Sequence, residues 1–248
     1  MNTKIIVTLF TALLSAAGFA AEWKNPDEQP VEGTQGTAPP PPRVVAPAPV
    51  PAVQPVQTVL LEGELGLEAQ WSCNLEQVYN DKGSGGEQDV WIFLPAAASG
   101  YRIIGGYAQG NHHAPSSCVL TVKPLNQESA ALLQPPAGWR QIWNDRNSGA
   151  RADGSIWHPV SGNNEYVCLG SVANQGYGQP FVQQYACVHQ CLVETIPVPG
   201  YIWSDRGTGA SQDVSLYRLL NSHSFYAVPS HAKPAQLQDL RRELVCKF

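Results

Sequence analysis

Three segments of the chain share one motif and align without gaps, and this internal repeat limits the fold more than any other feature of the sequence. The motif reads aromatic, any residue, Asp, basic, Gly or Asn, Ser or Thr, Gly, small, two variable positions and a second Asp. It occupies residues 79–89, 143–153 and 203–213, so the copies are 64 and 60 residues apart. A strand is expected directly after each copy.

The sequence between the motifs alternates short apolar runs with clusters of Gly, Asn, Asp and Pro, which is typical of β structure. We expect about four strands in each repeat, with repeats at about 73–125, 139–194 and 200–248. A unit of this size cannot bury both faces of its own sheet, so three copies should pack around a common axis. The predicted fold class is all-β, a pseudo-threefold β-prism stabilised by disulfides. Residues 234–244 carry Leu at helical spacing and predict the one helix.

The N-terminal quarter of the chain differs from the rest. Residues 1–20 have the basic start, short apolar run and small residues of a signal peptide. Residues 21–57 are expected to be a disordered, Pro-rich linker, because 10 of the 21 prolines lie between residues 26 and 57. The prism is assigned to 58–248. We therefore expect an exported protein, periplasmic or extracellular, that does not span a membrane.

Six cysteines predict disulfides, since their number is even and the protein is expected to be exported. They are Cys73, Cys118, Cys168, Cys187, Cys191 and Cys246. The spacing does not choose among the 15 pairings, but we predict a bond from Cys73 to Cys246, because these two residues lie before the first repeat and at the end of the third and would close the domain. A strand would separate Cys187 and Cys191 by about 13 Å, too far to pair with each other. Zinc binding by these two with His189 is the less favoured alternative.

Charge and motif content exclude two classes of function. The chain has 15 Lys and Arg against 20 Asp and Glu, and no basic run, which argues against a nucleic-acid partner. No nucleophile and base set, phosphate-binding loop or zinc-hydrolase motif is present in the sequence, and we find no His that recurs in register. We therefore predict a protein that is not an enzyme.

The paired acidic residues of the motif are candidate ligand-binding residues. They are Asp81, Asp89, Asp145, Asp153, Asp205 and Asp213. The favoured interpretation is structural, with each Asp accepting backbone N–H groups two or three residues further on. The alternative is that two carboxylates and loop carbonyls bind Ca²⁺. No other cofactor is expected.

The recurring aromatic residues Tyr79, Trp143 and Trp203 have two interpretations as well. A fixed position in every repeat favours core packing, whereas exposed rings would stack on sugars or lie in a bilayer interface. Tyr107, His112, His113 and Tyr177 lie in long polar loops, where recognition is common. We interpret His112 and His113 as a solvated pair rather than a metal site.

With its motif written as W-x-D-x-G-[ST]-G-A-x-x-D-V, the chain resembles the vacuolar protein sorting-associated protein sixty-two family from about Cys73 to Phe248. That repeat is similar to multivesicular-body-associated β-prism modules, which bind membrane surfaces and have counterparts in the targeting domains of pore-forming toxins. The resemblance implies a surface-binding prism and not an enzyme. Departures are Asn147 in place of Gly, Gly154 in place of Val, and a missing Gly in the third repeat.

These observations favour a non-catalytic module that recognises a glycan or a lipid headgroup on a surface, with three loops for multivalent attachment. It could also target a separate toxin-like partner to that surface. The alternative is a structural or assembly protein that docks to an envelope or secreted protein, which an exposed apolar patch would favour. A hydrolase would require a deep polar cleft that interrupts the threefold pattern.

Overall fold

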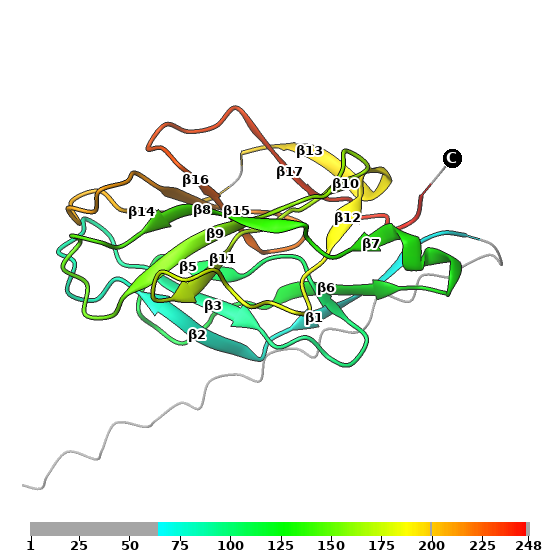
Figure 1. Ribbon diagram of the computed structural model, residues 1–248, viewed down its shortest axis with the longest axis horizontal. Helices are drawn as coiled ribbons and strands as arrows, with labels where there is room; N and C mark the ends of the chain where they lie inside the picture. The colour runs from blue at the N-terminus through cyan, green and yellow to red at the C-terminus, as the bar shows by residue number, and fades with distance from the viewer. Residues whose placement is uncertain (1–63, 199, 247–248) are drawn as a thin grey trace, which may run out of the picture. The chain divides into compact units, whose positions relative to one another are not determined.

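The computed structural model describes residues 64–198 and 200–246 (Figure 1). The expected signal peptide at 1–20 and linker at 21–57 lie outside these residues. The chain divides into two compact units, 1–50 and 51–248, and every described residue belongs to the second. Among the described residues, no helix is long and apolar enough to cross a bilayer.

The described residues form strands β1 to β17 and two short 3-10 helices, so the expected all-β class is confirmed. The elements of the first repeat are β1 (Leu67–Ser72), β2 (Leu75–Asn80), β3 (Trp91–Pro95), β4 (Arg102–Ile103), β5 (Tyr107–Gln109) and β6 (Val119–Pro124). The next are η1 (Glu128–Leu132), β7 (Leu133–Gln134), β8 (Gly138–Asn144), β9 (Gly154–Val160), β10 (Tyr166–Val167), β11 (Val172–Gln175), β12 (Cys187–His189) and η2 (Gln190–Leu192). The last are β13 (Val193–Pro197), β14 (Gly200–Ser204), β15 (Ser215–Arg218), β16 (Phe225–Val228) and β17 (Gln236–Leu240).

Three of the sheets have the same antiparallel construction, one in each repeat. Their strand orders are β2-β3-β5, β8-β9-β11 and β14-β15-β16. In each, the register of the first strand pair shifts just before the motif aromatic, between Gln77 and Tyr79 in the first repeat. A bulge at this position turns the strand and re-aims the aromatic side chain. The sequence repeat is therefore also a structural repeat.

A second sheet accompanies each of these three. Their orders are β1-β6-β4, β10-β12-β7 and β13-β17. The first two repeats thus have six strands and the third has five, rather than the four that the sequence predicted. The predicted helix at 234–244 is wrong, because β17 occupies 236–240 and pairs along its whole length with β13. Among residues 64–198 and 200–246, the third repeat has no strand that corresponds to β4 and β10.

Three backbone hydrogen bonds link the three repeats in a ring. The N–H of Gly106 donates to the C=O of Ser171 (2.8 Å), Ser171 to Phe225 (2.8 Å), and Phe225 back to Gly106 (3.0 Å). The residues before them approach so closely that a Cβ atom at Gly105 would lie 2.6 Å from that of Ser224. Ser224 thus stands where the other repeats have Gly. Strand 225–228 corresponds to β5 and β11.

All six cysteines are in disulfides, and the predicted bond from Cys73 to Cys246 is wrong. The pairs are Cys73–Cys118, Cys168–Cys187 and Cys191–Cys246. The first pair follows from strand register, because Ser72 at the end of β1 lies opposite Val119 at the start of β6. Cys187 and Cys191 have separate, distant partners, as expected. Because both are oxidised, the alternative of a zinc site with His189 is excluded.

Candidate functional site

The first Asp of each motif is buried and holds its own loop closed. One carboxylate oxygen, Oδ1, accepts the backbone N–H of the residue nine positions further on. These donors are Val90 for Asp81 (2.9 Å), Gly154 for Asp145 (3.1 Å) and Val214 for Asp205 (3.0 Å). The structural interpretation of these Asp residues therefore holds, but the bond reaches nine residues along the chain and not two or three.

Each motif loop turns through a residue with positive φ. This angle is 93° at Gly83, 70° at Asn147 and 79° at Gly207. Asn is one of the few residues with a side chain that adopt this left-handed conformation. The departure of the second repeat from the motif therefore leaves the turn unchanged.

The motif aromatics lie in the core, between the repeats. Tyr79, Trp143 and Trp203 are at most 1% exposed, and neighbouring rings meet edge to face with centroids 5.7 to 5.8 Å apart. Such burial leaves no ring face for a ligand. We therefore correct their assignment as ligand-binding residues in favour of the core alternative.

The indole N–H groups connect one repeat to the next. Trp143 Nε1 donates to Asp205 Oδ2 at 2.9 Å, and Trp203 Nε1 donates to Asp81 Oδ2 at 3.1 Å. Tyr79 occupies the same position in the first repeat, but its hydroxyl is buried without a hydrogen-bond partner. Burial, and then the nearby charge of Asp145, raise the pKa of Tyr79 well above its ordinary value.

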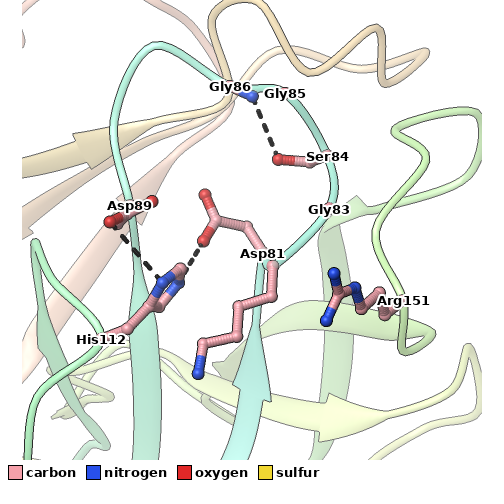
Figure 2. A pocket seen from close by; sticks show the side chains of 9 residues that line it. Asp81, Gly83, Ser84, Gly85, Gly86, Asp89, His112 and Arg151 are labelled. Carbon is pink, nitrogen blue, oxygen red and sulfur yellow. Dashed lines mark hydrogen bonds and ion pairs between the residues drawn. The ribbon is translucent and has the colours of Figure 1, made fainter. Parts of the chain in front are cut away.

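A His side chain lies between the two motif Asp residues in the first repeat (Figure 2). His112 Nε2 is 2.8 Å from Asp81 Oδ1, and His112 Nδ1 is 3.6 Å from Asp89 Oδ2. The His112 side chain is only 16% exposed, so its interpretation as part of a solvated pair is wrong. His113 next to it is exposed.

The same arrangement occurs in the third repeat. His231 Nε2 is 2.6 Å from Asp205 Oδ1, and His231 Nδ1 is 3.8 Å from Asp213 Oδ2. The inference that no His recurs in register is therefore wrong. A gapless alignment conceals the match because His112 follows its Asp by 31 residues and His231 by 26.

The second repeat replaces this His with Tyr177. The Tyr177 hydroxyl donates to Asp153 Oδ1 at 3.0 Å. Desolvation, and then this hydrogen bond, raise the pKa of Tyr177 to about 12, so it remains a neutral donor. Burial also raises the pKa of Asp145 from its ordinary value.

The Asp and His sets have the residue types of a metal site. In each set, one ligand atom from every member lies within 4.8 Å of the others. However, the Asp81 carboxylate already accepts hydrogen bonds from Val90 and Trp203 besides its contact with His112. We therefore assign these sets to closing the loops.

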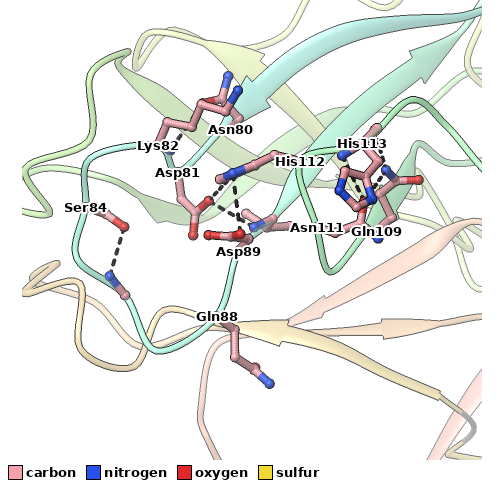
Figure 3. A network of polar contacts seen from close by, with 12 residues as sticks. Asn80, Asp81, Lys82, Ser84, Gln88, Asp89, Gln109, Asn111, His112 and His113 are labelled. Carbon is pink, nitrogen blue, oxygen red and sulfur yellow. Dashed lines mark hydrogen bonds and ion pairs between the residues drawn. The ribbon is translucent and has the colours of Figure 1, made fainter. Parts of the chain in front are cut away.

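The loop that carries His112 is fixed by a polar network (Figure 3). The buried Gln109 donates from Nε2 to Asn111 Oδ1 at 2.8 Å and to the carbonyl of His113 at 2.6 Å. Asn111 Oδ1 in turn accepts the backbone N–H of His113. These bonds hold the chain on both sides of His112 and so place its ring over Asp81.

The three Gly-rich loops contact one another and form a single surface, which we call the loop face (residues 82–89, 146–153 and 206–213). The N–H of Arg151 donates to the Lys82 carbonyl, and the N–H of Glu87 donates to the Arg206 carbonyl, both at 2.9 Å. Asn147 Nδ2 donates to Ser211 Oγ at 2.8 Å. These loops lie at the left of Figure 1. Because they touch, they form one continuous surface rather than three separate ones.

Charges on the loop face differ in what they contact. The carboxylates of Asp89, Asp153 and Asp213 each face a His or Tyr of the same repeat. The loop face also exposes four cations, at Lys82, Arg146, Arg151 and Arg206, and in the part of the chain that the structure describes none of them forms an ion pair.

Aromatic rings and a pocket accompany these cations. Lys82 Nζ lies 5.1 Å from the centre of the Trp91 ring, and the Arg146 guanidinium lies 4.4 Å from that of Tyr177. The pocket beside Lys82 has a volume of about 310 Å³ and extends to Asp81, His112 and Arg151 (Figure 2).

Comparisons with known proteins agree with this architecture. The chain is similar to the crystal structure of GNIP1Aa from Chromobacterium piscinae, with 29% sequence identity and a TM-score of 0.61. The match covers 73% of this chain and 37% of that one, so the chain spans little more than a third of that protein. No curated protein matches the chain at a significant level.

The family comparison covers most of the sequence. Residues 44–224 match the family described as Vacuolar protein sorting-associated protein 62. This range contains all three copies of the motif. It also contains Gly106 and Ser171, two of the three residues in the ring of backbone hydrogen bonds. The chain belongs to the Vacuolar protein sorting-associated protein 62 family.

Proposed function

We propose that this chain is an exported, non-catalytic binding module that attaches to an anionic surface through its loop face. The observation that carries the proposal is an exposed cation directly after the first motif Asp in every repeat, at Lys82, Arg146 and Arg206, none of which has an ion-pair partner among the described residues. The carboxylates of Asp89, Asp153 and Asp213 each face a His or Tyr, whereas these three cations have no ion-pair partner among the described residues, so their charges are available to an anionic ligand.

The proposed scaffold is a β-prism with its three sheets about a pseudo-threefold axis. The ring of hydrogen bonds through Gly106, Ser171 and Phe225 supports this arrangement. So does the pattern in which Trp143 and Trp203 each donate to the Asp of another repeat. A rigid scaffold of this kind fixes the spacing of the three cations, which reduces the entropy lost on binding.

The proposed ligand on this face is an anionic lipid headgroup. A Lys or Arg close to an anionic bilayer contributes about 1 kcal/mol, so three contribute about 3 kcal/mol, or roughly 100-fold in affinity. The attraction is screened by salt. A neutral glycan would not use the cations, and we therefore place it second.

Export is supported by the three disulfides, because such bonds persist in oxidising compartments. The alternative of a docking or assembly protein has less support. The large exposed apolar side chains of the described residues are Val160, Phe181, Tyr201 and Leu220. They come from separate elements, so they do not suggest one apolar docking patch.

The test is cosedimentation of the full-length protein with phosphatidylcholine vesicles, with and without phosphatidylserine. The variant K82Q/R146Q/R206Q removes one cation from each motif loop and should lose roughly 100-fold in affinity for the anionic vesicles. The control R102Q/K123Q/R242Q has the same net charge but leaves the loop face intact, and it should bind like the unmodified protein. The proposal is rejected if the unmodified protein ignores anionic vesicles or if both variants lose binding equally.

A further inference from the structure

A second candidate site lies between the second and third repeats, where the third repeat has fewer strands than the other two. A cavity of about 800 Å³ is lined by residues of β8, β9, β10, β13, β16 and β17. These strands lie in the upper half of Figure 1. In the part of the chain that the structure describes, the third repeat has no strand that corresponds to β4 and β10, so β17 here lines a cavity instead of pairing with a further strand. The volume is within the range of small-molecule sites.

The charge of this cavity is unlike that of the chain. The chain has a formal net charge of −5, yet no Asp or Glu lines the cavity. Arg140, an exposed residue of β8, does line it. Within residues 64–198 and 200–246, Arg140 forms no ion pair. An unpaired guanidinium without nearby acids favours a ligand with a carboxylate, which it can bind through two parallel hydrogen bonds.

Next to Arg140, two rings form a neutral wall. His158 packs edge to face on Tyr226 with centroids 4.8 Å apart, and its Nδ1 lies 3.2 Å from Ser171 Oγ. Burial, and then the charge of Arg140, lower the pKa of His158 to about 4, so its imidazole is uncharged at neutral pH. Arg140 is therefore the cation that would attract an anion here.

The remaining lining groups are suited to hydroxyl groups. Four exposed amide side chains line the cavity, at Asn163, Asn164, Gln236 and Gln238. An amide both donates and accepts hydrogen bonds, as a sugar hydroxyl does. Tyr166 and Tyr226 also line it and offer aromatic surface to the C–H face of a sugar ring.

We propose that this cavity binds an acidic saccharide, with the carboxylate on Arg140 and the hydroxyl groups on the surrounding amides. The site is separate from the loop face. β9 begins at Gly154, which bonds to the motif residue Asp145, and His158 lies about 13 Å further along that strand. The proposal therefore does not depend on lipid binding by the loop face.

The test is isothermal titration calorimetry of the full-length protein with sialyllactose, and with lactose as the neutral counterpart. The unmodified protein should bind sialyllactose and not lactose. Arg140→Gln should weaken binding by at least roughly 10-fold, because it removes a charge-assisted pair of hydrogen bonds. Gln238→Ala should weaken it by a smaller factor. Arg102→Gln, a matched charge loss on β4 in the first repeat, should leave binding unchanged.

Four outcomes decide the proposal. Retained binding in K82Q/R146Q/R206Q supports a site distinct from the loop face. Unchanged binding in Arg140→Gln, with the thermal unfolding of the protein preserved, overturns the proposal. So does equal affinity for inorganic phosphate and sialyllactose, because the site would then recognise an anion and not a saccharide. Failure of the unmodified protein to bind sialyllactose or a glucuronic-acid oligosaccharide also overturns it.

Discussion

Trp203 Nε1 donates a hydrogen bond to Asp81 Oδ2 at 3.1 Å, across 122 residues of sequence. This bond joins the third repeat to the first, as the bond from Trp143 to Asp205 joins the second to the third. In the first repeat, the position of the indole is taken by Tyr79, whose hydroxyl has no partner. A hydrogen bond from an indole to a buried carboxylate therefore links two pairs of repeats, and the Tyr79 hydroxyl makes no such bond for the remaining pair.

We predict that Trp203→Phe destabilises the protein by about 2 to 4 kcal/mol. The substitution removes buried ring area and leaves a buried carboxylate oxygen of Asp81 without its indole donor. Trp143→Phe should behave in the same way through Asp205. Urea denaturation followed by Trp fluorescence, with far-UV circular dichroism as a second probe, measures the free energy of unfolding.

Tyr79→Phe is the matched comparison and should change stability by less than about 1 kcal/mol. Its hydroxyl is buried without a hydrogen bond, so its loss removes no favourable contact and relieves the cost of burying a polar group. A loss as large as that of Trp203→Phe would mean that the Tyr79 hydroxyl has a partner in solution.

Asn147 should tolerate Gly better than Ala. Its φ of 70° lies in the left-handed region, where a Cβ without a local polar group costs about 1 kcal/mol or more. Asn147→Gly loses only the side-chain bond to Ser211 Oγ, whereas Asn147→Ala loses that bond and adds backbone strain. Thermal unfolding of both variants should place Ala below Gly; the reverse order would show that this turn does not require positive φ.

The three disulfides should contribute unequally to stability. They span 45, 19 and 55 residues, for which loop entropy predicts about 4, 3 and 4 kcal/mol. Replacing Cys168 and Cys187 together by Ser should therefore cost the least. Chemical denaturation of the three double-Ser variants measures the order, and a greater loss for Cys168 and Cys187 would require a native-state contribution beyond loop entropy.

Stability should fall as pH drops from about 6.5 towards 4. The pKa of His158 is about 4 in the folded protein, because of burial and then Arg140, against 6.5 for an exposed His. Between these values the unfolded chain binds the proton and the folded chain does not, so acid favours unfolding. Relative to neutral pH, this lowers the free energy of unfolding by at most about 3 kcal/mol, and it has no effect above about pH 6.5. His158→Gln should flatten this part of the curve in urea denaturation at pH 7, 5 and 4; an unchanged slope would contradict the assignment.

The repeat and its turns could be predicted because they depend on local backbone chemistry. Positive φ requires Gly or Asn, and these residues recur at Gly83, Asn147 and Gly207. The all-β class follows from the same short-range pattern. Residues 236–240 show the limit of that reasoning, because pairing with β13 makes them a strand despite their helical spacing of Leu.

Other features depend on which distant segments meet, and a single sequence does not contain that information directly. Cys73 pairs with Cys118 because β1 lies beside β6. The equivalence of His112 and His231 is concealed by connecting loops of unequal length. The cavity at Arg140 arises from a strand that the third repeat lacks, and an alignment of similar motifs gives no signal of that loss.

The ring through Gly106, Ser171 and Phe225 has a consequence for how such a protein can evolve. In an open array of repeats, a copy can be added or deleted at an end and the neighbours remain paired. In a closed ring each copy has two neighbours, so losing one leaves a backbone donor and an acceptor facing each other across a gap. Losing a copy would therefore cost backbone hydrogen bonds in both remaining repeats, which disfavours a change in the number of copies.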